Sequence, residues 1–286
     1  MTTRRFFFPV AASVSVFAYS GLVLLDRAYG TLRGAATWPV IALYLLAFAA
    51  YLAVLWSLER GGGWSAGWAW GTAVLARLLL LFTSPSLSDD VWRTVWDGHL
   101  ALNGISPYAL AVNDGALDFL AIPERALVNN AWMASPYLPA AQALFALAAV
   151  IGRQPLILQL LMVLCDLLAA WVITRLLALA ALPGRRVMLY LWNPLVIVEV
   201  AHCAHLDAWM VLLVLLALWA ALRRPSTGLN TLLSPLFLAL ATLTKLLPAL
   251  VAPVLFWRWS WLQRLLFPLL ALLILLPFGL DAGWGL

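Results

Sequence analysis

Apolar stretches long enough to cross a lipid bilayer recur along this chain from its first residues to its last. Crossing a hydrocarbon layer of about 30 Å takes roughly 20 apolar residues in a helix. The stretches are continuously apolar instead of alternating, which favours helices over a barrel. With 65% hydrophobic and only 10% charged residues, the chain carries more apolar surface than a soluble core uses. We therefore expect an all-α, polytopic membrane protein.

The pattern predicts a bundle of about 9–11 spans in a single transmembrane domain covering 1–286. Three N-terminal spans lie within 1–83, at about 7–25, 38–57 and 66–83, and a long polar loop with short interfacial helices covers 84–137. Further spans follow within 138–286, at about 138–152, 187–201, 206–222 and 264–280.

Two apolar runs, 155–181 and 231–257, leave the number of crossings open. Basic residues on both sides of each run favour an even number of crossings, hence two short helices with a turn near Asp166 or near Lys245. One long tilted helix is the alternative. Pro248 and Pro253 favour the helix pair in 231–257, whereas neither interpretation is favoured in 155–181.

Basic residues also set the expected orientation. If Arg4 and Arg5 stay in the cytoplasm, three crossings place the loop on the extracytoplasmic face of the inner (plasma) membrane, although Arg27 and Arg33 argue weakly against this. The net charge of +5 comes from Arg residues at the ends of apolar runs and forms no basic stripe. Nucleic acid is therefore excluded as a partner.

The loop begins with adjacent carboxylates, Asp89 and Asp90, directly after a span. An ionised carboxylate can accept a proton from a bound hydroxyl, and an Asp before a helical pattern can equally be a helix N-cap. Trp92, Arg93 and Trp96 have the spacing of an amphipathic interfacial helix.

Polar residues also interrupt the apolar stretch 187–222, where Asn193, His202, His205 and Asp207 stand. Such groups are costly in a membrane and usually face a cavity, so we expect a site there. A metal site is the weaker interpretation, since no second ligand cluster exists. Lys245 either reaches to the interface or binds an anion, a carboxylate or a lipid phosphate.

Five segments resemble polyprenyl-phosphate-sugar-dependent glycosyltransferases of the membrane C superfamily, particularly bacterial mannosyltransferase-like proteins. They are SDDVWRTVWDG (88–98), NGISPY (103–108), YLPAAQ (137–142), LWNPLVIVEVAHCAHLD (191–207) and ATLTKLLP (241–248). This chain departs from the family pattern at Trp92, usually Tyr, and at Leu138, usually Pro. It also stops at Leu286, earlier than such relatives, so a truncated or inactive homologue is an alternative.

The resemblance implies transfer of a sugar, expected to be mannose, from a polyprenyl phosphate to a lipid or glycan acceptor, with inversion and without a metal or other cofactor. A lipid or glycolipid transporter or flippase is the other alternative. The implied roles are a catalytic base for Asp89 or Asp90, contacts with the donor phosphate for Arg93, His205 and Lys245, and substrate contacts for Trp96, Asp97, Tyr108, Tyr137, Asn193 and Asp207.

Overall fold

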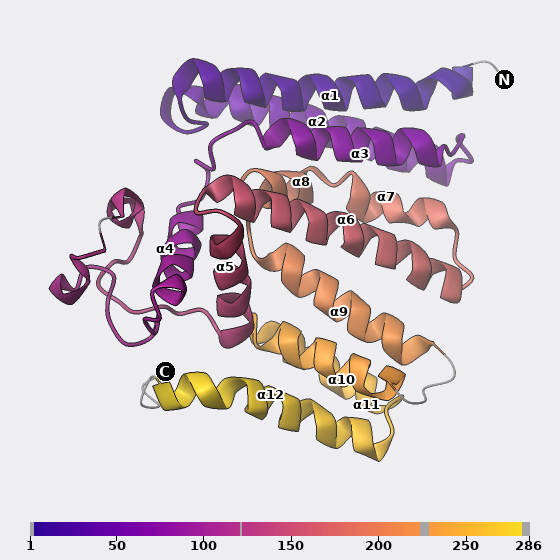
Figure 1. The fold of residues 1–286 in the computed structure, drawn as a ribbon. Helices are drawn as coiled ribbons and strands as arrows, with labels where there is room; N and C mark the ends of the chain where they lie inside the picture. Colours follow the sequence, from indigo (N-terminus) through magenta and orange to yellow (C-terminus); the bar gives the residue numbers. More distant parts are fainter. Residues whose placement is uncertain (1–2, 121, 224–228, 282–286) are drawn as a thin grey trace. The chain divides into compact units, whose positions relative to one another are not determined.

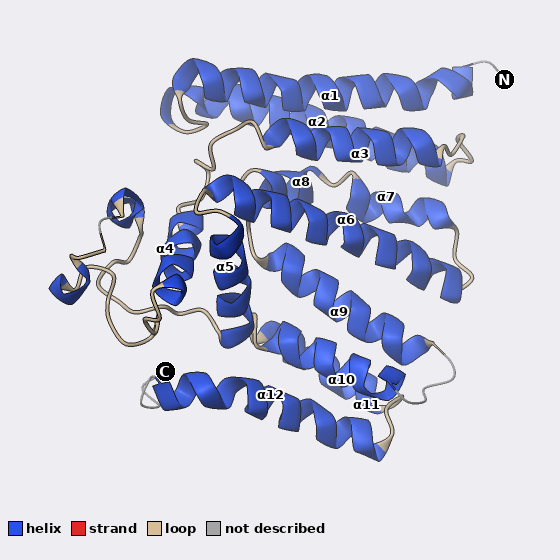
Figure 2. Ribbon diagram, viewed as in Figure 1, coloured by secondary structure: helices blue, strands red, loops and turns tan. Residues whose placement is uncertain are grey.

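The computed structural model describes residues 3–120, 122–223 and 229–281, and within them every regular element is a helix (Figures 1 and 2). Twelve α-helices, α1 to α12, and five short 3-10 helices occur in this part of the chain. The all-α prediction is confirmed. The side chains of Arg4 and Arg5, and all of Arg224, lie outside the described residues, so the orientation that they indicate stays a prediction.

Four helical segments among the described residues are long and apolar enough to cross a membrane. They are Phe7–Tyr29, Gly34–Glu59, Pro155–Leu179 and Trp261–Gly279. Shorter apolar helices of 10–17 residues accompany them at Ala66–Leu80, Pro139–Ile151, Asp207–Leu222, Thr231–Thr242 and Leu247–Phe256. The chain is thus a multi-pass membrane protein by length and composition, as expected.

The chain divides into two compact units, Met1–Ser88 with Met162–Ala204 and Asp89–Leu161 with His205–Leu286. In the first unit, α1 (Thr3–Tyr29), α2 (Thr37–Glu59) and α3 (Ala66–Leu80) lie side by side (Figure 1). Small side chains such as Ala12, Ala69 and Ala73 are fully buried where these helices meet. Small residues let membrane helices approach closely, which is how helices associate without a hydrophobic driving force.

The run 155–181 forms one helix, α6 (Pro155–Leu179), and not a pair with a turn at Asp166. From Met162 onward α6 belongs to the first unit. Asp166 pairs there with Arg77 of α3, and both side chains are fully buried. Arg77 Nη1 also donates to the carbonyls of Ala73 and Leu191, at 3.0 and 3.1 Å. A paired carboxylate needs no exit from the apolar interior, so Asp166 does not interrupt the helix.

The expected span 187–201 is instead two short helices, α7 (Met188–Leu191) and α8 (Pro194–Ala201). The break falls at Trp192-Asn193-Pro194, because Pro194 has no N–H to continue the preceding helix. Asn193 is the N-cap of α8, and its side chain accepts a hydrogen bond from Leu195 N at 3.0 Å. Polar capping inside an apolar segment thus explains this asparagine.

In the second unit, α4 (Asp90–Leu102) packs against α5 (Pro139–Ile151) (Figure 1). Gly98 makes this contact close: a Cβ at this position would lie 2.6 Å from the carbonyl oxygen of Phe145. The loop between these helices includes two 3-10 turns, Gly115–Leu117 and Pro123–Leu127. The loop shares a small core with α4, formed by Trp96 and Leu100 of the helix and by Val112, Leu117, Leu120 and Val128 of the loop.

The other helices of this unit are α9 (Asp207–Leu222), α10 (Leu229–Thr242), α11 (Ala252–Phe256) and α12 (Trp261–Asp281), with α10 packed against both α9 and α12. The run 231–257 is broken as expected: α10 ends at Thr242, and the chain then turns through Lys245 and returns along α10. Trp259 Nε1 donates to Ser234 Oγ at 2.8 Å across this return. The predicted break is thus present in the structure, whereas the two membrane crossings and the single domain stay predictions.

Candidate active site

The second unit contains a pocket of about 570 Å³ that combines an acidic and a basic side chain. Its charged lining residues are Asp90, Lys245 and Arg93. The other lining residues are uncharged: Asn129, Asn130, Met133, Pro136, Tyr137, Leu138, Thr244 and Leu246. The pocket therefore brings together the start of α4, the end of the loop and the turn after α10.

Asp90 is the first residue of α4 and is half-buried. Its Oδ1 accepts a hydrogen bond from Asn129 Nδ2 at 3.0 Å, which orients the carboxylate. A carboxylate is also favourable at this end of the helix, where backbone N–H groups carry partial positive charge. Asp89, the preceding residue, is exposed at the N-cap position and is not among the residues that line the pocket.

Lys245 enters the pocket from the turn that follows α10. The backbone places it there, since Ala140 N at the start of α5 donates to the carbonyl of Leu243 at 3.0 Å. The Lys245 ammonium forms an ion pair with Asp207 in the first turn of α9, with Nζ and Oδ2 2.7 Å apart. Both side chains are more than 40% exposed, so the ammonium keeps access to a further anion.

Arg93 holds the loop in place with its guanidinium. Nη1 donates to the carbonyl of Met133 at 3.1 Å, and Nη2 donates to those of Asn129 and Asn130 at 3.1 and 2.8 Å. Asn130 has a φ of 48°, a left-handed conformation that Asn tolerates better than most residues. Arg93 is only 3% exposed, and these backbone carbonyls accept its hydrogen bonds. Its guanidinium also adds positive charge to the lining of the pocket.

Asp97 is almost completely buried one turn further along α4, at 1% exposure. It accepts hydrogen bonds from Ser135 Oγ and, at 2.8 Å, from Gln142 Nε2. Burial raises the pKa of Asp97 to about 6, while the bonds from Ser135 and Gln142 and the charge of Arg93 oppose that shift. Asp97 does not line the pocket.

The two predicted tyrosines lie together. Tyr108 Oη donates to the carbonyl of Tyr137 at 2.7 Å, and the Tyr137 ring packs edge-on against Phe145, with ring centroids 5.1 Å apart. Burial raises the pKa of both phenols, so they are neutral donors at physiological pH. Of the two, only Tyr137 lines the pocket.

Three other predicted residues do not line this pocket. Trp96 is 1% exposed in the loop core, with the Arg125 guanidinium 5.5 Å from its ring centroid. His205 lies in the turn before α9, and Asn193 belongs to the first unit.

His202, considered as a metal ligand, has both ring nitrogens in hydrogen bonds: Nδ1 with Thr83 Oγ1, and Nε2 with the backbone N–H groups of Ser86 and Leu87. These bonds occupy the lone pair that a metal would need.

The structure adds pocket and network residues to the predicted set. Asn129 orients Asp90, and Ser135 and Gln142 bind Asp97. The sequence carries only weak signals for them: an Asn-Asn pair typical of turns, and a lone Gln in an apolar helix. A buried Gln in a helix that is otherwise apolar is the better signal, because it needs a hydrogen-bond partner.

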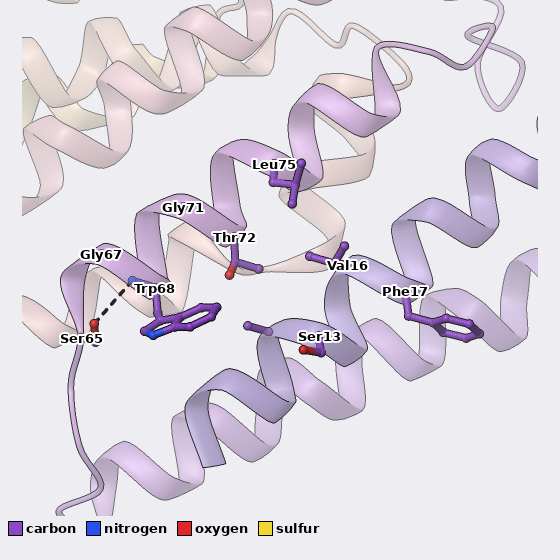
Figure 3. A pocket seen from close by; sticks show the side chains of 10 residues that line it. Ser13, Val16, Phe17, Ser65, Gly67, Trp68, Gly71, Thr72 and Leu75 are labelled. Carbon is purple, nitrogen blue, oxygen red and sulfur yellow. Dashed lines mark hydrogen bonds between the residues drawn. The ribbon is translucent and has the colours of Figure 1, made fainter. Parts of the chain in front are cut away.

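A larger cavity, of about 770 Å³, lies in the first unit between α1 and α3 (Figure 3). Glycines, apolar side chains and the hydroxyl residues Ser13, Ser65 and Thr72 line it, and none of its lining residues is ionisable. The Ser65 hydroxyl caps α3 by accepting from Trp68 N. Without a base or a charged donor this cavity cannot support acid–base chemistry, so the Asp90–Lys245 pocket is the candidate active site.

Comparison with known proteins identifies the family. Residues 9–261 match the MptA_B family, described as alpha-(1->6)-mannopyranosyltransferase, N-terminal domain. No curated protein and no solved structure shows significant similarity. The match covers most of the chain, and the family name implies a mannose donor and an acceptor. The chain therefore belongs to this family of mannosyltransferases, which are hexosyltransferases, and the predicted resemblance is confirmed.

Proposed function

We propose that this chain transfers a mannosyl group from a polyprenyl-phosphate donor to a hydroxyl of a lipid or glycan acceptor, with inversion, in the Asp90–Lys245 pocket. One observation carries the proposal: a carboxylate able to accept a proton and an ammonium able to bind a phosphate line the same pocket. A general base and a cation at the leaving group are the two elements that this reaction needs.

Asp90 acts as the general base. As the acceptor oxygen forms its bond to the anomeric carbon, the hydroxyl proton passes to Asp90, and the bond from that carbon to the phosphate oxygen breaks. The hydrogen bond from Asn129 keeps the carboxylate in a fixed orientation for this transfer. A well-placed general base contributes roughly 10²–10⁴ to the rate.

Lys245 stabilises the departing polyprenyl phosphate. A phosphate is already a good leaving group, so charge stabilisation matters more than protonation by a general acid. Asp207 holds the ammonium in place, and the exposure of both partners leaves Nζ able to contact a phosphate oxygen. Arg93 contributes charge at longer range because its hydrogen bonds go to the backbone. His205 does not line the pocket, so its role at the donor phosphate rests on the family resemblance alone.

The membrane helices hold the lipid part of the donor, and transfer takes place on the extracytoplasmic face of the plasma membrane. The apolar helices of the second unit support the first statement. Residues 84–137 follow three N-terminal apolar helices, which supports the second if Arg4 and Arg5 are cytoplasmic.

The test is a transfer assay with the purified chain in proteoliposomes, polyprenyl-phosphate mannose as donor and a mannose-containing glycolipid as acceptor. Lys245→Ala should lower kcat/KM for the donor by roughly 100-fold, and Lys245→Arg should restore part of it. Asp118→Asn is the control for removing a charge outside the pocket, because Asp118 is an exposed carboxylate of the loop between α4 and α5, where it pairs with Arg125 at 2.8 Å. Movement of intact donor lipid across the bilayer without sugar transfer would contradict the proposal and favour a flippase.

A further inference from the structure

Three consecutive residues, Pro136, Tyr137 and Leu138, form one side of the candidate active site, and we call them the 136–138 wall. The wall lies where the loop ends and α5 begins at Pro139. Loop ends of this kind are the most mobile parts of a fold unless hydrogen bonds hold them. What holds this wall therefore decides the shape of the pocket.

Ser135, the residue before the wall, forms hydrogen bonds with both its backbone N–H and its hydroxyl. Its backbone N–H donates to the carbonyl of Pro107 at 2.9 Å. Its Oγ accepts from Tyr137 N at 3.3 Å and from Gln142 Nε2 at 2.7 Å, and donates its own proton to Asp97. The hydroxyl thus connects the backbone of the wall to α4 and to α5.

Asp97 completes this network from inside the protein. Its Oδ2 accepts from both Ser135 and Gln142, and this one oxygen orients both partners. At 1% exposure the carboxylate has no path to a substrate in the pocket. The next residue, Gly98, lets α4 approach Phe145 of α5, so that Asp97 can reach Gln142.

We propose that Asp97 is a positioning residue for the candidate active site: through Ser135 and Gln142 it fixes the 136–138 wall and thereby the place of Tyr137 beside Asp90. This differs from the substrate contact that the family resemblance implied for Asp97. Its effect on transfer rests on the proposed function, whereas its effect on the wall does not.

Hydrogen exchange of the backbone amides tests the wall directly, with no substrate present. Asp97→Ala removes the shared acceptor, so exchange at Ser135 and Tyr137 should accelerate roughly tenfold or more. Asp97→Asn keeps one side-chain oxygen for both bonds, so exchange there should stay close to the wild-type rate. Ser135→Ala should accelerate exchange at Tyr137 as Asp97→Ala does, and the double variant should add little. Asp118→Asn is the control for a loop carboxylate outside the network.

Transfer kinetics on the same proteins provide the second readout. Asp97→Ala should raise the KM for donor or acceptor by about tenfold or more with a smaller change in kcat, and Asp97→Asn should restore KM. Wild-type exchange at Tyr137 in Asp97→Ala, or faster exchange in Asp97→Asn equal to that in Asp97→Ala, would overturn the inference. Faster exchange in Asp97→Ala together with a wild-type chain that transfers no sugar would uphold the positioning role and reject the proposed function instead.

Discussion

The ammonium of Lys245 lies 2.7 Å from the carboxylate of Asp207, and the two residues come from a turn after α10 and from the first turn of α9. An exposed ion pair of this kind adds little to stability. Its significance is that Asp207 orients the long, flexible side chain of Lys245, which lines the same pocket as Asp90.

This pairing predicts unequal effects of the two substitutions. Lys245→Ala removes the cation and should cost more transfer activity than Asp207→Ala, which removes only its orienting partner. The Asp207→Ala loss should be about tenfold or less, and the double variant should resemble Lys245→Ala, because one variant removes the group through which the other acts. Steady-state kinetics with varied donor concentration measure this. Additive losses in the double variant would show that Asp207 acts independently of Lys245.

The buried pair Arg77–Asp166 predicts a stability effect in the first unit. Arg77→Leu or Asp166→Leu alone leaves an unpaired charge between apolar helices and should destabilise the protein by roughly 3–5 kcal/mol. The double Leu variant should be clearly more stable than either single variant. Thermal unfolding in detergent, followed by circular dichroism, is the measurement. A double variant as unstable as the worse single variant would mean that the pair is not the source of the effect.

Burial of Asp97 predicts a pH-dependent cost of folding. Its pKa is about 6 in the folded chain against 3.8 when unperturbed, so between these values the folded state holds a proton that the unfolded state has lost. Stability from this group therefore falls as the pH rises from about 4 to about 6, by roughly 3 kcal/mol in total. The charge of Arg93 lowers the pKa of Asp97 and so opposes part of this shift. Burial raises the pKa of Tyr108 and of Tyr137, so both neighbouring phenols stay neutral in this pH range.

Asp97→Asn carries no such proton and should remove this cost. Its unfolding temperature should exceed that of the wild type at pH 7.5, and the difference should shrink at pH 4.5. His99 lies on the same helix, and burial lowers the pKa of its imidazole, so it is a second group that could make stability depend on pH. The variant His99→Gln serves as the control that separates its contribution from that of Asp97. An equal difference at both pH values would show that the Asp97 carboxyl does not titrate as described.

Gly98 predicts a steric effect at the contact of α4 with α5. Gly98→Ala would place a methyl group 2.6 Å from the Phe145 carbonyl oxygen, so the helices must separate. We expect a loss of about 1–3 kcal/mol in stability and faster amide exchange in the 136–138 wall. Ala101→Ser, at an exposed position of the same helix, is the control. Unchanged stability in Gly98→Ala would contradict the close approach.

Long-range pairing explains which features the sequence alone could predict. The long helices, the break at Lys245 and the loop follow from apolar run length and proline positions, which are local properties. The partner of Asp166 lies 89 residues away in the sequence, at Arg77, so no local pattern could distinguish a buried ion pair from a turn.

The candidate site divides in the same way. Family motifs brought Asp90, Tyr137 and Lys245 into one prediction, and the structure brings these three to one pocket. Trp96 and Asp97 belong to the same motif, yet neither lines the pocket: Trp96 packs in the loop core, and Asp97 binds Ser135 of the loop and Gln142 of α5. Successive residues of a helix face different directions. Asn129, which orients Asp90, comes from a loop position that helical periodicity does not constrain.

The most direct test of the central claim compares two adjacent carboxylates, since Asp90 lines the pocket and Asp89 lies exposed at the helix N-cap. In the transfer assay with polyprenyl-phosphate mannose, Asp90→Asn should lower kcat by roughly 10²–10⁴. Asp89→Asn, which removes a carboxylate outside the pocket, should lower it by about fivefold or less. A loss of activity in Asp89→Asn with full activity in Asp90→Asn would contradict the assignment of Asp90 as the base.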